Sequence, residues 1–178
     1  MSLPPYLSRL ALPLLLLGAA ASTPAWADQR PVPFKASVST QETLSFDAQR
    51  CPGFAPFLVG TTTGKGTASD MSAVTLLATD CPLTQDGVNF FFSDGRLTLT
   101  AANGDKLTAS YSGTLLPVPG ANPPVHAING TFSVTGGTGR FAGARGGGSL
   151  QGSEDIVTLK GRYEVKGMLT LRSESDRD

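Results

Sequence analysis

The residues most suggestive of chemistry are glycines late in the chain, where residues 135–143 read TGGTGRFAG. Gly137, Gly139 and Ala142 have the GxGxxA spacing of a loop that approaches a dinucleotide pyrophosphate. Such a loop needs a helix directly after it, because the helix N-terminus holds the phosphate groups. Here the chain continues as ARGGG, and glycine is a very poor helix former. The sequence therefore argues against a nucleotide site, and a P-loop is excluded because no GK[ST] follows.

The side chains that commonly catalyse reactions form no recognisable set. His126 is the sole histidine; it follows two prolines, which predicts a surface loop rather than a catalytic position. Neither GxSxG nor HExxH occurs, and nothing positions a serine triad around His126. Glu154 and Asp155 are adjacent, so on a strand they would point to opposite faces. We predict a solvated turn there, and we expect no catalytic residue, metal ion or cofactor.

The first 27 residues have the features of a secretory signal peptide. Arg9 precedes a twelve-residue apolar run, Leu10 to Ala21, and an A-x-A cleavage sequence ends at Ala27. The run is too short to be a comfortable transmembrane helix, and no other stretch could span a bilayer. We therefore predict export to the periplasm or the extracellular space, with a mature chain that starts at Asp28.

Two cysteines, Cys51 and Cys81, remain in the exported chain. Export makes a disulfide the leading interpretation, because oxidising compartments favour paired thiols. The alternative is a pair of small buried residues. A reactive thiolate is disfavoured because each cysteine is followed by proline and the sole histidine, which could lower a thiol pKa, lies far away in sequence.

Length and composition predict one all-β domain over residues 28–178, with a core of about 34–171. The chain has 178 residues and 21 glycines, and residues that favour strands outnumber helix formers after the leader. The formal net charge is zero, so electrostatics give no case for nucleic acid as a partner.

Alternation of apolar and polar residues marks the strands, and one hairpin has a predictable register. From Arg96 to Leu115, a three-residue loop ending at Gly104 pairs Leu99 with Leu107, so that apolar residues share a face. Two further glycines at 64 and 66 suggest a bulge in an earlier strand.

Glycines between two late strands indicate a corner of a small barrel. Gly136, Gly137 and Gly139 allow the tight bend that a barrel needs to turn from one strand to the next. Phe141 is the one large apolar side chain at this corner. We expect it to plug one end of the core.

The run GGTGRFAGARG, residues 136–146, resembles the GGTGxFxxAxG signature of the allene oxide cyclase barrel and dirigent-like superfamily. The segments GKGTAS (64–69) and LTAANGDKLTASYSGT (99–114) are similar to the same group in the same order, most of all to its bacterial secreted branch. The resemblance implies a single antiparallel β-barrel of about eight strands, its core filled or nearly so, and a homo-oligomer as in many relatives. It also implies a ligand-binding role for Arg145, although an ion pair on the surface is the plainer interpretation.

Three functions remain open from the sequence. The leading one is non-catalytic binding of a small lipophilic molecule. The alternatives are a solid barrel with a structural or interaction role, and an isomerase or cyclase on an apolar substrate, or dirigent-like control of coupling. Allene oxide cyclases use a buried glutamate and ordered water without a metal, and no motif places that glutamate here. A buried carboxylate with a raised pKa in an open apolar lumen would favour the enzyme.

Overall fold

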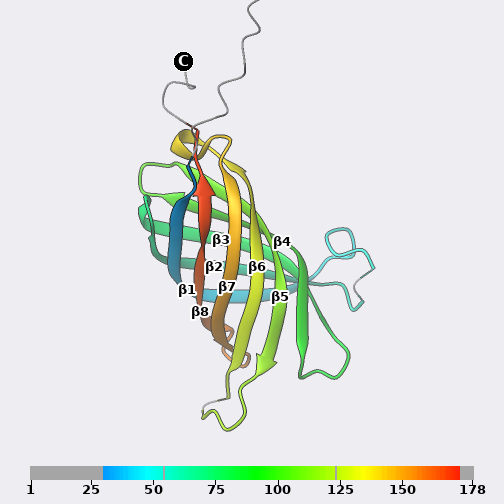
Figure 1. Ribbon diagram of the computed structural model, residues 1–178. Helices are drawn as coiled ribbons and strands as arrows, with labels where there is room; N and C mark the ends of the chain where they lie inside the picture. The colour runs from blue at the N-terminus through cyan, green and yellow to red at the C-terminus, as the bar shows by residue number, and fades with distance from the viewer. Residues whose placement is uncertain (1–29, 54, 123, 173–178) are drawn as a thin grey trace, which may run out of the picture.

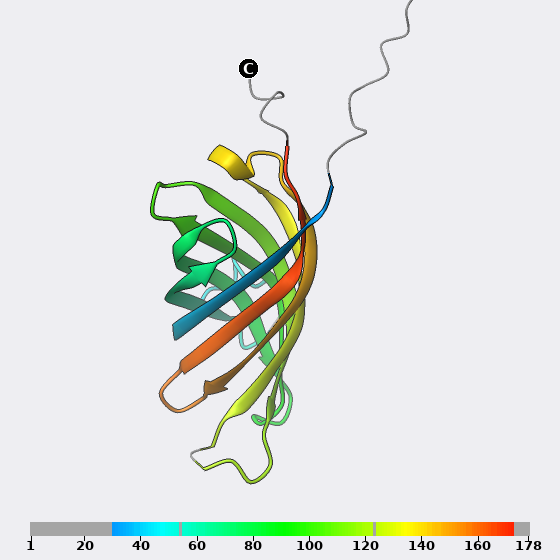
Figure 2. The same cartoon turned by 60° about the vertical axis from the view of Figure 1, so that its left-hand side comes forward.

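The chain forms a closed barrel of eight antiparallel strands, as Figures 1 and 2 show. The computed structural model describes residues 30–53, 55–122 and 124–172. The predicted signal peptide and the cleavage point before Asp28 lie outside the described residues. The strands are β1 (Val32–Phe46), β2 (Leu58–Ala68), β3 (Ser72–Thr84), β4 (Phe90–Ala101), β5 (Lys106–Pro117), β6 (His126–Gly137), β7 (Arg145–Asp155) and β8 (Lys160–Thr170). The all-β, eight-stranded barrel that the sequence predicts is confirmed.

Each strand pairs with its neighbours in the sequence, and β1 pairs with β8 to close the barrel. Closure leaves no free sheet edge to pair with another chain. In β1 the inward series begins with Phe34, Ala36 and Val38, which are all buried, while the residues between them face outward or are less buried. This alternation of buried positions explains why the sequence forms strands rather than helices.

The predicted hairpin register is confirmed between β4 and β5. Leu99 faces Leu107 and Leu97 faces Ala109. Gly104 has a φ of +89° and its N–H donates to the carbonyl oxygen of Ala101 at 3.0 Å. The three-residue loop thus places a glycine where a left-handed backbone is required.

The bulge predicted at Gly64 and Gly66 is wrong. Strand β2 pairs continuously with β1 and β3 through both positions. A Cβ atom on Gly66 would overlap the carbonyl oxygen of Ser37 on β1. The glycine is therefore required because neighbouring backbones approach closely, which is the other common reason for glycine in a strand.

The glycine corner lies at one end of the barrel, between β6 and β7. Between β6 and β7 a single 3₁₀ turn, η1 (Gly139–Phe141), carries Phe141 into the core, where its side chain is fully buried. Gly136 and Gly139 have φ angles of +146° and +58°. Both lie in the region that a side chain disfavours, which accounts for two of the corner's glycines.

A disulfide joins Cys51 to Cys81, so the predicted pairing is confirmed. It ties the loop between β1 and β2 to the C-terminal half of β3. Both sulfur-bearing side chains are buried together with Val59. Among the described residues no helix is long and apolar enough to cross a membrane.

Candidate functional site

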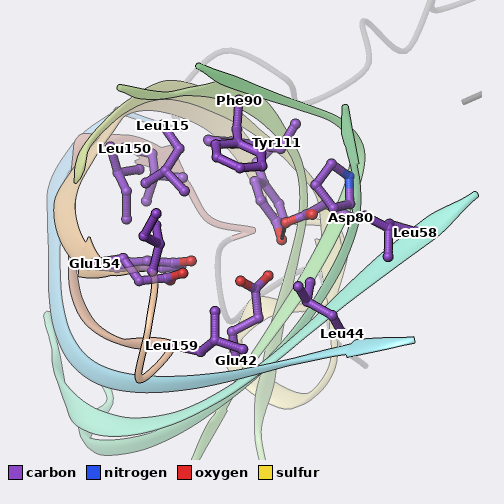
Figure 3. Close-up of a pocket in the computed structure, with 15 residues that line it drawn as sticks. Glu42, Leu44, Leu58, Asp80, Phe90, Tyr111, Leu115, Leu150, Glu154 and Leu159 are labelled. Atoms are coloured by element: carbon purple, nitrogen blue, oxygen red, sulfur yellow. Dashed lines mark hydrogen bonds between the residues drawn. The ribbon is translucent and has the colours of Figure 1, made fainter. Parts of the chain in front are cut away.

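A cavity of about 140 Å³ lies at the end of the barrel opposite the glycine corner. It is bounded by the last residues of β1, β3, β5 and β7 and by the first residues of β2, β4, β6 and β8. Figure 3 looks into it. Its wall is mostly apolar and aromatic, and is made by Leu44, Leu58, Pro82, Phe90, Phe92, Tyr111, Leu115, Ile128, Leu150, Ile156, Leu159 and Tyr163.

Three carboxyl groups point into this cavity, from Glu42 on β1, Asp80 on β3 and Glu154 on β7 (Figure 3). Each acidic residue is separated by an even number of positions from the apolar residues of its own strand that point into the barrel. Asp80 follows Leu76 and Ala78 in this series, and Glu154 follows Leu150. Since alternate residues of a strand share a face, the pattern that builds the core also carries the acids inward.

Asp80 is held by a short hydrogen bond. The Tyr111 hydroxyl donates to its Oδ2 at 2.6 Å, and both side chains are buried. Burial raises the pKa of Asp80 to about 6. The hydrogen bond from Tyr111 and the charge of Arg50 lower this pKa, whereas the charge of Glu154 raises it. Burial also raises the pKa of Tyr111 well above its ordinary value, which keeps the hydroxyl as a donor.

The carboxyls of Glu42 and Glu154 face each other in the cavity (Figure 3). Burial and the nearby charges of Glu154 and Asp80 raise the pKa of Glu42 to about 9. Burial also raises the pKa of Glu154, although the charge of His126 opposes the rise. Like charges in a poorly solvated space cannot all ionise, so the cluster holds at least one proton at neutral pH.

Glu154 is 3% exposed, and its Oε1 atom has no hydrogen-bond partner among the described residues. This contradicts the prediction of a solvated turn at residues 154 and 155. Glu154 is the last inward residue of β7, opposite His126 on β6. Asp155 alone serves the turn, accepting hydrogen bonds from the N–H groups of Val157 and Thr158.

His126 is buried as well, which corrects its assignment to a surface loop. It begins β6, and its Nε2 lies 3.0 Å from the carbonyl oxygen of Val88. His126 is the first residue of β6, so it takes an inward position in the first register pair with β7.

The residues predicted from the sequence lie outside this site. Arg145 is exposed, begins β7 at the opposite end of the barrel and does not line the cavity. Gly136, Gly137, Gly139 and Phe141 belong to that same far end. The disulfide is nearer, because Cys81 directly follows Asp80 and fixes that part of the cavity wall.

The carboxyl cluster itself was missed in the sequence. The sequence did contain a usable signal. In β1 every second residue points inward, and continuing this alternation past Val38 leads to Thr40 and then Glu42. Within the described part of the chain, no group of three or more His, Cys, Asp or Glu side chains is placed to hold a metal ion. The three acids line one cavity without forming a chelating set.

Comparison with known proteins adds little to this geometry. No family model matches the sequence, and no curated protein gives a significant match. Among solved structures, the pterocarpan synthase dirigent protein is similar, with a TM-score of 0.48 and 15% identity over 89% of this chain and 100% of that chain.

Proposed function

We propose that this barrel binds a small, largely apolar molecule in the cavity between Glu42, Asp80 and Glu154. The observation that carries the proposal is a pre-formed apolar cavity with a few convergent polar groups, the usual form of a small-molecule site. An empty cavity of about 150 Å³ accepts a benzene ring. The 140 Å³ space here therefore suits one ring or a short branched chain.

Export from the cytoplasm is part of the same proposal. It is supported by the signal-like sequence of residues 1–27 and by the disulfide between Cys51 and Cys81. The mature chain would then be residues 28–178. Membership of the bacterial secreted branch and formation of a homo-oligomer remain predictions from the resemblance.

A second function, acid-assisted isomerisation or cyclisation of the bound molecule, is favoured by one specific observation. Two carboxyls in one cavity have pKa values pushed apart, with Glu42 raised to about 9 and Asp80 to about 6. Such a pair supplies a protonated acid and a carboxylate at the same pH. In this function Glu42 would donate a proton to an oxygen of the substrate and Asp80 would accept one.

Native mass spectrometry of the protein purified from its own host, followed by organic extraction, tests the binding proposal. We expect a co-purifying apolar molecule of one mass, and the same spectrum gives the oligomeric state. The matched control is Ile128→Trp, which places an indole in the cavity. An empty wild-type protein, or a ligand that the Trp variant retains, would contradict binding at this site.

A further inference from the structure

The cavity gathers acidic side chains without any basic side chain of its own. Of the described residues that line it, three are acidic and none is lysine or arginine. The guanidinium of Arg50, whose charge acts on Asp80, is hydrogen-bonded to the carboxylate and carbonyl of Asp94 and to the carbonyl of Thr79. Buried acids are normally paired with a positive charge. No residue of the described cavity wall provides that charge for these three acids.

A separate observation shows where that counter-charge would fit. The Oε1 atom of Glu154 is buried, has no partner among the described residues and belongs to a side chain that is 3% exposed. Figure 3 shows its carboxyl directed into the cavity, toward the carboxyl of Glu42. An unsatisfied buried acceptor carries a full desolvation cost, which a donor on a bound molecule would relieve.

The aromatic wall suits the same kind of group. Phe90, Phe92, Tyr111 and Tyr163 line the cavity beside the acids. The faces of aromatic rings attract a cation within about 6 Å, whereas they offer nothing to an anion. Carboxyl groups and aromatic side chains together in one small cavity suit an organic cation.

We propose that the ligand of this cavity is an organic cation, a protonated amine on a ring or short apolar chain, with its N–H groups donating to Glu42, Asp80 and Glu154. The inference rests on the proposed binding function and names its ligand class. The ammonium would use the vacant acceptor of Glu154, and the apolar part would lie against Leu115, Ile128 and Leu150.

Proton release is a distinctive consequence. The groups that face the acids or act on their charge are Tyr111, Tyr163, His126, Asp155 and Arg50. The pKa of Glu42 is raised by burial and by its acidic neighbours, so the carboxyl holds its proton near neutral pH. A cation beside it favours ionisation. Amine binding is therefore expected to release a proton, which also removes the acid that the isomerase mechanism needs.

Isothermal titration with benzylamine and with benzyl alcohol tests the proposal, because the two probes are similar in size and differ in charge at pH 7.5. We expect benzylamine to bind at least about tenfold tighter, as for hydrogen bonds to charged groups, and to release a proton when titrated in buffers of different ionisation enthalpy. Glu154→Gln should remove most of this preference. Glu164→Gln, the same change on a carboxylate of the outer surface that pairs with Lys166, should keep it.

The outcomes separate the inference from the proposed function. Equal binding of both probes, or tighter binding of the alcohol, would overturn the cationic ligand and leave the small-molecule site standing. A preference for benzylamine that survives in Glu154→Gln would likewise overturn the inference, since the charge would be recognised elsewhere. Binding of neither probe would overturn both. Thermal unfolding of each variant, with one cooperative transition, confirms that it is folded.

Discussion

Replacing Glu42 with glutamine should stabilise the barrel at neutral and alkaline pH. The pKa of this carboxyl is raised from 4.5 to about 9 by burial and by its acidic neighbours. A group with a raised pKa in the folded state binds more protons folded than unfolded. Its contribution to stability is therefore complete below pH 4.5 and is lost as pH rises toward 9. Glutamine keeps the shape of the neutral carboxyl and does not titrate.

The size of the effect follows from the pH interval. Each unit between the two pKa values changes the unfolding free energy by about 1.4 kcal/mol. From pH 5 to pH 8 the ceiling for Glu42 is then about 4 kcal/mol. Because the side chain is only partly buried at the end of the barrel, screening by water should reduce this to roughly 2 kcal/mol.

Urea denaturation of the wild type, Glu42→Gln and the outer-surface control Glu164→Gln at pH 5 and pH 8 measures this difference. The wild type should lose about 2 kcal/mol more than Glu42→Gln between the two pH values, and the control should follow the wild type. The carboxyls of Asp86 and Asp155 have lowered pKa values, so they affect stability only at more acidic pH. Equal pH slopes for wild type and Glu42→Gln would refute the reasoning.

Three further changes test the fold that holds the site. Replacing Cys51 and Cys81 with alanine should lower the unfolding free energy by about 3–4 kcal/mol, as expected for opening a loop of this length; an unchanged urea midpoint would contradict it. Gly66→Ala should cost at least about 2 kcal/mol because its methyl group meets the Ser37 carbonyl, and a well-tolerated alanine would show that the strands can separate there. Phe141→Ala should cost about 3–5 kcal/mol by opening a cavity at the glycine corner, and a melting temperature within a few degrees of wild type would argue against its role as the plug.

Local rules in the sequence predicted the strands and the glycine corner, whereas the eight-stranded barrel came from the family resemblance. Strand alternation, the loop at Gly104 and the corner at Phe141 each depend on neighbouring residues, so they are visible in a single chain. The sequence around Gly66 cannot distinguish a bulge from a close approach of two backbones, because the answer depends on Ser37 in the neighbouring strand. The pairing of Cys51 with Cys81 could be predicted because only two cysteines exist.

The site was harder to predict because its acids are far apart in the sequence. Glu42, Asp80 and Glu154 come from three strands that do not neighbour one another, and only closure of the barrel brings them together. Glu154 looked like part of a polar turn because Asp155 beside it does form one. His126 looked exposed because two prolines precede it, whereas β6 begins at that residue.

Nuclear magnetic resonance of the side-chain carboxyl carbons, followed during titration with benzylamine and, in a second sample, with benzyl alcohol, tests whether the cavity is a ligand site. If the end of the barrel is a small-molecule site, the signals of Glu42, Asp80 and Glu154 will shift together along one saturable curve, and that of Glu164 will stay in place. Shifts confined to surface carboxyls, or no saturable shift at the three cavity acids with either probe, would contradict a ligand site in this cavity.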